Sequence, residues 1–551
     1  MELAVFDSMR VKFRWSALAL LDRGVTSPVL RWLWSDHGGQ KFTKNLGDFR
    51  PCDSETVREM MSGRYLFAGR LVDTHGASPF SAQIAHLDWR GELYSFSWLR
   101  HFRDIRDDGG RRFARLLVLD WIGRYRRFDA EMWNISLTSQ RVMNWLRHLN
   151  LLVEGASAEQ TQLITGALFE QIQSLKIRAR FARDPADALM ARIALVGAAL
   201  CDGSTPEQVR KRLGQLEVLL SSHIDEDGMH KSRNPAAQIR FLTELVALRQ
   251  AIAQGEFAGQ SQLTGLVKLM QNVPVALTLG TGELGYFNGC GQQAVDLVFA
   301  LQAQGDSAPA QNGVIGGYGV LRDGDAIVVA DAGKVPDVEF SGAAHAGALS
   351  FEFSYGTEMI VANCGPAPAE LWEKALLFRQ GSAHSCPTVG GFPAVRVAKK
   401  GVFAGRLIGQ VKPPEIVADV DDIALQITNF DYLEQLSISA ERRLTLMSNG
   451  NTLVGQDKFT FSQAHSDAVP ITIRFHLGPG IEIAREDKED ILRLKLPSGE
   501  KWSFLWEGAT VKLDDSVRQS AHFGFYRTKQ IVVERMLDQD AEIAWILTRN
   551  V

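Results

Sequence analysis

The hydrophobic pattern changes character near the middle of the chain. From about residue 111 to 301, apolar residues recur at the three- and four-residue spacing of amphipathic helices. The clearest stripe consists of Phe113, Leu116, Leu117, Trp121 and Tyr125, and further helices are predicted at 139–152, 158–181, 186–200, 206–222 and 235–253. Successive helix hairpins build a bundle, a solenoid or an incomplete toroid, and periodicity does not choose among these.

After residue 312 the pattern becomes that of short strands. Apolar and polar positions alternate, and turn signals such as Asp323-Gly324 and Gly478-Pro479-Gly480 recur between the segments. Strands are predicted at 314–321, 326–330, 348–354, 358–362, 402–409, 423–430, 442–447, 458–461, 471–476, 491–496, 502–506, 510–513, 530–534 and 542–547. This spacing is typical of a large antiparallel β-sandwich. Because a helical half precedes an all-β half, we predict segregated domains of an α+β multidomain protein.

The length of 551 residues favours two or three domains. We predict a Trp-rich lead-in segment at 1–100, a helical domain at 101–311 and a β-sandwich at 312–551. The tryptophans of the first segment either pack in a core or stack on sugars.

Composition and charge narrow the functional classes. Lys and Arg number 60 against 64 Asp and Glu, so overall charge gives no reason to expect a nucleic-acid partner. The five cysteines are scattered, include no Cys-x-x-Cys, and are interpreted as free thiols in a reducing compartment. Neither a signal-peptide pattern nor a membrane-spanning apolar run is recognised, so we predict a cytoplasmic protein.

The candidate chemistry lies around the residues 341–385. His345 stands just before one predicted strand, Asn363 just after the next, and His384 follows a helix-like insertion. Tyr355-Gly356-Thr357 is typical of the turn between the two strands. Since loop ends on a rigid sheet are places where polar side chains converge, we expect these three residues to approach one another.

This stretch resembles the C-terminal domain of the heparinase II/III-like polysaccharide lyases. The resemblance is carried by His345-Ala346-Gly347, Asn363 and Ala383-His384-Ser385, and it extends over most of the chain. It implies an incomplete α/α toroid followed by the sandwich, and an acidic polysaccharide or oligosaccharide as partner. Many members of the family are secreted or periplasmic, so a periplasmic location is the alternative to the cytoplasm.

Lyases of this family cleave uronate-containing glycans by β-elimination. A base removes the proton next to the uronate carboxyl, and an acid protonates the departing oxygen. By resemblance, Tyr286 in the glycine-rich loop is the candidate acid, and His345 and His384 complete the candidate catalytic set. The alternative for Tyr286 is a packed aromatic ring in a tight turn.

Four residues are candidates for binding the substrate. Arg233 and Asn234 lie on a loop-to-helix element resembling that of the family, and Asn288 follows the candidate acid. Guanidinium and amide donors suit a carboxylate. Asn234 alternatively caps the helix that Pro235 begins. Arg141, on a tryptophan-rich helix, contributes either to a glycan subsite or to hydrogen bonding within its own domain.

The resemblance also implies a divalent metal site, with zinc as the candidate ion and His345, Asn363 and His384 as its ligands. Imidazole is a good zinc ligand, whereas a neutral amide is a poor one. The alternative is a hydrogen-bonded polar cluster that braces the sandwich. No other cofactor is implied.

Three functions are therefore compared. The first is a lyase acting on a uronate-containing glycan. The second is a non-catalytic glycan-binding protein on a lyase scaffold, because several of the family's motif positions carry other residues here. The third is a toroid glycoside hydrolase with Asp225 and Asp227 as acid and base, although carboxylates in such a loop are also typical of solvated turns. The oligomeric state does not follow from any pattern in the chain.

Overall fold

The computed structural model describes residues 2–34, 42–105, 107–254, 261–305, 309–391, 395–401, 403–408, 412–463, 467–485 and 490–550. The chain forms two compact units, which are described separately. Unit 1 comprises Met1–His223 and Arg240–Val267, and unit 2 comprises Ile224–Ile239 and Lys268–Val551. The segment 224–239, predicted within the helical domain, thus groups with the β-rich unit.

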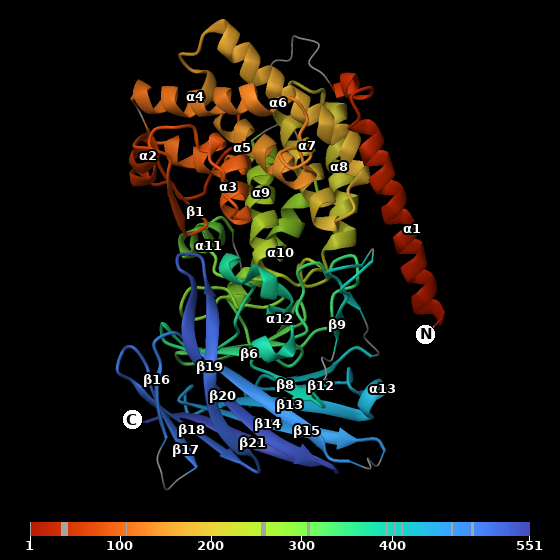
Figure 1. The fold of residues 1–551 in the computed structure, drawn as a ribbon, viewed down its shortest axis with the longest axis vertical. Coiled ribbons are helices and arrows are strands. Elements are labelled where there is room, and N and C mark those ends of the chain that lie inside the picture. The colour runs from red at the N-terminus through yellow and green to blue at the C-terminus, as the bar shows by residue number, and fades with distance from the viewer. Residues whose placement is uncertain are drawn as a thin grey trace. The chain divides into compact units, whose positions relative to one another are not determined.

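Unit 1 is almost entirely helical (Figure 1). Its helices are α1 (Glu2–Val25), η1 (Arg31–Trp34), α2 (Ser54–Met61), η2 (Pro79–Ser81), α3 (Leu87–Ser95), η3 (Ser97–Phe102), α4 (Asp108–Tyr125), α5 (Ile135–Val153), α6 (Ala158–Arg178), η4 (Ala179–Phe181), α7 (Pro185–Cys201) and α8 (Pro206–His223). A small hairpin, β1 (Arg64–Phe67) and β2 (Arg70–Asp73), is inserted between α2 and η2. Helix α9 (Pro235–Ala253) begins in unit 2 and continues into unit 1.

Local sequence explains where these helices begin. Ser157 and Gln160 form a reciprocal capping box at the start of α6, which satisfies two backbone donors that would otherwise lack partners. At α7 the side chain of Asp184 accepts from the backbone of Ala186, and Pro185 occupies the first helical position. Most of the tryptophans are buried and pack against one another, as in the core-packing interpretation of the lead-in segment.

Unit 2 contains two large antiparallel sheets. One has the strand order β11-β12-β13-β14-β21-β18-β17-β16, and the other runs β19-β20-β15-β7-β6-β5-β4-β3, with β8 joining β15. The strands of the first are β11 (Glu415–Asp419), β12 (Ala424–Asn429), β13 (Ile438–Met447), β14 (Thr452–Phe461), β16 (Glu482–Arg485), β17 (Ile491–Lys495), β18 (Lys501–Glu507) and β21 (Ala541–Arg549). Those of the second are β3 (Gly313–Ile315), β4 (Tyr318–Asp323), β5 (Ala326–Asp331), β6 (Phe351–Tyr355), β7 (Glu358–Ala362), β8 (Pro387–Val389), β15 (Val469–Leu477), β19 (Thr510–Ser520) and β20 (Gly524–Leu537).

The remaining elements of unit 2 are short or lie in its loops. They are α10 (Leu263–Leu277), which spans the division between the units, α11 (Val295–Gln302), η5 (Ala369–Lys374), α12 (Ala375–Phe378), η6 (Gly381–Ala383), α13 (Leu433–Leu436) and the hairpin β9 (Arg396–Val397) with β10 (Leu407–Ile408). Among the residues that the structure describes, no helix is both long enough and apolar enough to cross a bilayer.

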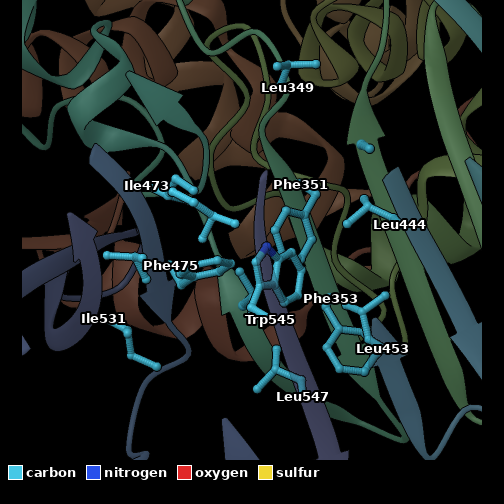
Figure 2. Packing of buried hydrophobic residues seen from close by; sticks show 14 of the residues in the cluster. Leu349, Phe351, Phe353, Leu444, Leu453, Ile473, Phe475, Ile531, Trp545 and Leu547 are labelled. Carbon is cyan, nitrogen blue, oxygen red and sulfur yellow. The ribbon is translucent and has the colours of Figure 1, made fainter. Parts of the chain in front are cut away.

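The core of unit 2 lies between the two sheets. Strand β13 alternates buried and half-buried positions along its length, as the period of a strand requires. Figure 2 shows Trp545 at the centre of this core, where its ring stacks on Phe351 at 5.5 Å and meets Phe475 edge-on at 4.8 Å. A fully buried ion pair, Arg442 with Asp457 at 2.7 Å, is included in the core, and the indole of Trp545 donates to the same carboxylate.

Two strand predictions were wrong. A strand was predicted at 402–409, but within the described residues 403–408 only Leu407–Ile408 forms one, and residues 402 and 409 lie outside the described residues. A single strand was predicted at 314–321, but Gly316 and Gly317 both have positive φ and turn the chain into the hairpin β3–β4. The lead-in segment was not predicted to begin with a helix, although α1 is 24 residues long. The strand β7 and the helix α9 have the bounds predicted from the sequence.

Candidate functional site

The two histidines of the candidate site contact each other directly. His345 lies in the loop before β6, and η6 brings His384 beside it, so that His345 Nδ1 and His384 Nε2 are 2.9 Å apart. His384 Nδ1 lies 2.8 Å from the carbonyl of Gln380, which can only accept. The proton of His384 is therefore on Nδ1, and His345 Nδ1–H donates to His384 Nε2. This leaves Nε2 of His345 with a free lone pair.

Burial keeps both rings neutral. Desolvation lowers the pKa of His384 to about 4, and it lowers the pKa of His345 well below its ordinary value, with the neighbouring His384 acting in the same direction. Gly347 is required here, because a Cβ at that position would lie 2.8 Å from the ring of His384.

The three predicted metal ligands are close together, but their polar atoms face protein groups. The His345 and His384 rings hydrogen-bond to each other, and the side-chain oxygen of Asn363 accepts from the backbone of Ser385 at 2.9 Å. Its Nδ2 is buried without a hydrogen-bond partner among the described residues, and an amide nitrogen donor cannot ligate a cation. Within the described ranges no group of three His, Cys, Asp or Glu side chains could hold a metal ion. These residues do not fit zinc, and the polar-cluster alternative describes their contacts.

Tyr286 is held by a buried carboxylate that sequence patterns did not single out. Glu352 on β6 accepts from the backbone N–H of Tyr286 at 2.9 Å and from that of Asn363 at 2.7 Å. Burial raises the pKa of Glu352 to about 7, although the nearby Arg518 and the two backbone donors oppose the shift. This one side chain therefore fixes the glycine-rich loop to the end of β7.

The ring of Tyr286 is buried beneath the guanidinium of Arg518, whose Cζ lies 4.2 Å from the ring centroid. Burial raises the pKa of Tyr286 above its ordinary value, which keeps the hydroxyl protonated, and Arg518 acts in the opposite direction. The hydroxyl has no hydrogen-bond partner among the described residues. A Cβ at Gly365 would meet the ring at 2.8 Å, so glycine is needed for this packing.

Most donors of Arg233 are directed at the protein itself, four of its five N–H groups having partners. Its guanidinium donates to the carbonyls of Gly316, Gly317 and Lys334 and forms an ion pair with Asp331 at 2.6 Å. It also lies over the ring of Tyr318, with 4.6 Å between Cζ and the centroid. The backbone of Arg233 has a positive φ of 53°, which is strained for a residue with a side chain. These contacts leave little of the guanidinium for a substrate carboxylate.

The walls around this guanidinium are glycines. A Cβ at Gly333 would lie 2.6 Å from Arg233 Cζ, and one at Gly317 would lie 2.9 Å from its Nε. The close approach of the backbone on both sides is therefore possible only without side chains. We name the buried set Arg233, Asp331, Tyr318, Asn288 and His345 the brace.

The two asparagines of the prediction have different contacts. The side-chain oxygen of Asn234 accepts from the backbone of Ala236 and Ala237 at the start of α9, which is the capping alternative. Asn288 donates to the hydroxyl of Tyr318 at 2.8 Å, and its oxygen accepts from the backbone of His345 at 3.3 Å. Asn288 thus links the glycine-rich loop to the histidine loop.

The other candidates do not join this set. Arg141 belongs to unit 1, where it is fully buried, donates to the carbonyls of Tyr94 and Met132, and lies over the ring of Trp121. Its contacts are those of the alternative, hydrogen bonding within its own domain. Asp225 accepts from the backbone of Asp227 and Met229, and Asp227 accepts from that of Gly316, so both carboxylates shape turns.

The structure therefore brings together Asn288, His345 and His384, and it adds Asp331, Tyr318 and Glu352. A sequence signal existed for the glutamate alone, because a charged residue between Phe351 and Phe353 is unusual in a strand buried on both faces. Asp331 and Tyr318 are ordinary strand-end residues in the sequence, and only the pairing of β4 with β5 places them opposite each other.

Known proteins resemble both parts of the chain. The family model described as heparinase II/III-like, C-terminal, matches residues 305–546. FtsZ-localized protein C of Caulobacter vibrioides (strain NA1000 / CB15N) is 26% identical over 527 residues, which cover 91% of this chain and 89% of that protein.

Solved structures with low sequence identity to this chain share its fold. A crystal structure of heparinase III matches with a TM-score of 0.70 at 11% identity, over 94% of this chain and 88% of that one. A heparan sulfate lyase HepC mutant from Pedobacter heparinus matches with a TM-score of 0.57 at 13% identity, over 91% and 84%. These likenesses confirm the predicted fold class, an incomplete α/α toroid followed by a large antiparallel β-sandwich.

Proposed function

We propose that this chain, whose residues 305–546 match the heparinase II/III-like C-terminal family model and whose fold resembles that of heparinase III, binds an acidic glycan without cleaving it. The observation that carries this proposal is that the protein itself occupies most of the donors of Arg233. Four of its five N–H donors are directed at three backbone carbonyls and at Asp331, inside the protein. In this proposal the brace has a structural role, and other residues of the scaffold bind the glycan.

The chemistry of β-elimination supports this choice. Removal of the proton next to a uronate carboxyl requires donors or positive charge directed at that carboxyl as negative charge develops. Asn234 caps a helix, Arg233 is paired, and Asn288 holds Tyr318 and His345. None of these three presents an unused cationic group to a ligand. The donors that remain are neutral, namely the amide N–H groups of Asn234, which the helix cap does not use.

A second candidate, a lyase cleaving a uronate-containing glycan, is favoured by one specific observation. His345 Nε2 carries a lone pair that takes no part in the hydrogen bond to His384, and the residue is 5% exposed. Tyr286 keeps a protonated hydroxyl, as an acid for the leaving oxygen must. In this candidate His345 is the base and Tyr286 the acid.

One experiment separates the two candidates. The protein is mixed with heparan, chondroitin, alginate and oligouronate substrates, while binding is followed by calorimetry and cleavage by the absorbance of the unsaturated uronate. We expect binding without new absorbance, and unchanged binding in Tyr286→Phe, which retains the buried ring. New absorbance that disappears in both His345→Ala and Tyr286→Phe would overturn the proposal and establish the lyase. Folding of each variant is checked by circular dichroism.

Location is a separate proposal. The name of the Caulobacter relative says that it is localised with FtsZ, and we propose that this chain also associates with FtsZ and that it does so in the cytoplasm. The five cysteines, all free thiols, support a reducing compartment. Co-sedimentation with FtsZ polymers tests the association, which should saturate with increasing FtsZ. Recovery in the pellet that is equal with and without FtsZ would contradict it.

A further inference from the structure

A large cavity in unit 1 has no part in the candidate site. It has a volume of about 1180 Å³ and is lined by three segments: η1 with the preceding Pro28, the end of α4 with the residues that follow it, and the first half of α6. Ligand pockets are commonly ~300–1,000 Å³. The cavity is therefore large enough for an extended ligand of several rings.

Aromatic rings form one wall of this cavity. Trp34, Phe128 and Trp133 contact one another, with ring centroids 5.7 to 6.5 Å apart. Trp34 is only 6% exposed, and its indole Nε1–H is buried without a hydrogen-bond partner among the described residues. A buried indole nitrogen usually has a partner, but the indoles of Trp121, Trp145 and Trp502 also lack one among the described residues, so this donor supports a ligand only together with the rest of the lining.

Trp32 extends the aromatic wall into solvent. Its side chain is 61% exposed, although it lines the same cavity as the buried Trp34. Exposed tryptophan is characteristic of binding surfaces, because the flat ring buries much area on contact at a small cost in conformational entropy.

The charge of the lining is positive. Four arginines and two glutamates line the cavity. Arg124 pairs with Asp120 and Arg126 with Glu170. Arg127 is exposed and forms no ion pair or hydrogen bond within the part of the chain that the structure describes. A guanidinium without a carboxylate partner, in the same cavity as an exposed indole, suits an anionic group carried on a ring with an apolar face.

From these contacts we infer that the cavity of unit 1 is a binding site for an acidic oligosaccharide. The apolar face of a sugar ring packs on Trp32, carboxylate or sulfate groups pair with Arg127, and a ring hydroxyl accepts from Trp34 Nε1. The inference shares its ligand class with the proposed function, but it concerns different residues and does not involve the brace. A nucleotide also combines an anion with a ring that can stack on an indole, so ATP is included among the probes of the test.

The test measures binding to the full-length His345→Ala variant, which removes the candidate base, so that ligand is not consumed. The probes are an oligogalacturonate, a neutral maltooligosaccharide of equal length and ATP. Trp32→Ala and Arg127→Gln are compared with the matched controls Phe523→Ala, an exposed aromatic of unit 2, and Arg70→Gln, an exposed arginine of unit 1 outside the lining. Affinity is read by calorimetry and by quenching of tryptophan fluorescence.

We expect the oligogalacturonate to bind at least tenfold more tightly than the neutral sugar. Trp32→Ala should weaken it about tenfold or more and Arg127→Gln about threefold to tenfold, as loss of a stacking or charged contact does, while neither control changes affinity. Glycan binding that is equal in all four variants would overturn this inference and leave the proposed function standing. No binding of any acidic glycan would overturn both, and tighter binding of ATP, lost in Trp32→Ala, would assign the cavity to nucleotides instead.

Discussion

The brace of unit 2 and the cavity of unit 1 are built from the same kinds of residue but differ in what those residues contact. In the brace, Arg233 lies over Tyr318 and has its donors occupied by carbonyls and Asp331. In the cavity, Trp34 Nε1 is without a partner and Arg127 is without an ion pair in the described structure. An arginine beside an aromatic ring therefore indicates a binding site only when its donors remain available.

The largest effect expected is on stability, from Arg233→Met. The substitution leaves the carboxylate of Asp331 buried without its cation, which typically costs ~3–5 kcal/mol of unfolding free energy. Urea unfolding followed by circular dichroism measures the change, with the exposed Arg70→Met expected within ~0.5 kcal/mol of the parent. A loss below ~1 kcal/mol would show that Arg233 is not held as the brace requires and would reopen its role in binding.

A smaller effect is expected from acid on the histidine pair. The pKa of His384 is about 4 in the folded protein against an ordinary value of 6.5, because burial disfavours the charged ring. As pH falls, His384 takes up a proton in the unfolded chain before it does so in the folded protein. The contribution of neutral His384 to stability is therefore present above pH 6.5 and is lost as pH falls towards 4.

Each pKa unit corresponds to ~1.4 kcal/mol, so this contribution is on the order of 3 kcal/mol at most. His384→Gln should flatten the dependence of unfolding free energy on pH between 6.5 and 4. The matched control is His522→Gln, since His522 is exposed and is not part of the histidine pair. Equal slopes for the parent and His384→Gln would contradict the assignment of a neutral, buried pair.

Replacement of the capping residue Asn234 by alanine is expected to lower the unfolding free energy by about 1 kcal/mol. Asn234→Ala removes the acceptor for two backbone donors at the start of α9, and such caps contribute ~1 kcal/mol. Asn234→Asp keeps an acceptor and should recover most of the loss in thermal unfolding. Glycan affinity should be the same in both variants, and a selective loss of affinity without a loss of stability would return Asn234 to the binding residues.

The smallest effect on stability is expected in the cavity. Trp32→Ala should change the unfolding free energy by no more than ~0.5 kcal/mol, because the side chain is 61% exposed. The same variant carries the large expected change in glycan affinity, so stability and binding separate here, whereas they coincide in the brace. A destabilisation of ~2 kcal/mol or more would show that Trp32 is a packing residue and would remove it from the inferred site.

Local patterns were enough for much of the fold. The bounds of α9 and β7 follow from apolar periodicity. Pro235 marks the start of α9, and the turn at Gly356 precedes the start of β7. The hairpin β3–β4 was missed because Gly316 and Gly317 interrupt a short apolar run whose period alone is that of one strand. Helix α1 was missed because its apolar residues are distributed around the helix and form no distinct stripe.

The candidate site could be predicted only in part from such local patterns. The sequence alone determined that His345, Asn363 and His384 lie at strand and loop ends, because period and turn residues are properties of neighbouring positions. Only the tertiary structure decided that His345 donates to His384, that Glu352 holds Tyr286, and that Arg233 directs most of its donors at Asp331 and backbone carbonyls. The physical reason is that a hydrogen bond depends on atoms about 3 Å apart in space, which here come from residues tens of positions apart in the chain.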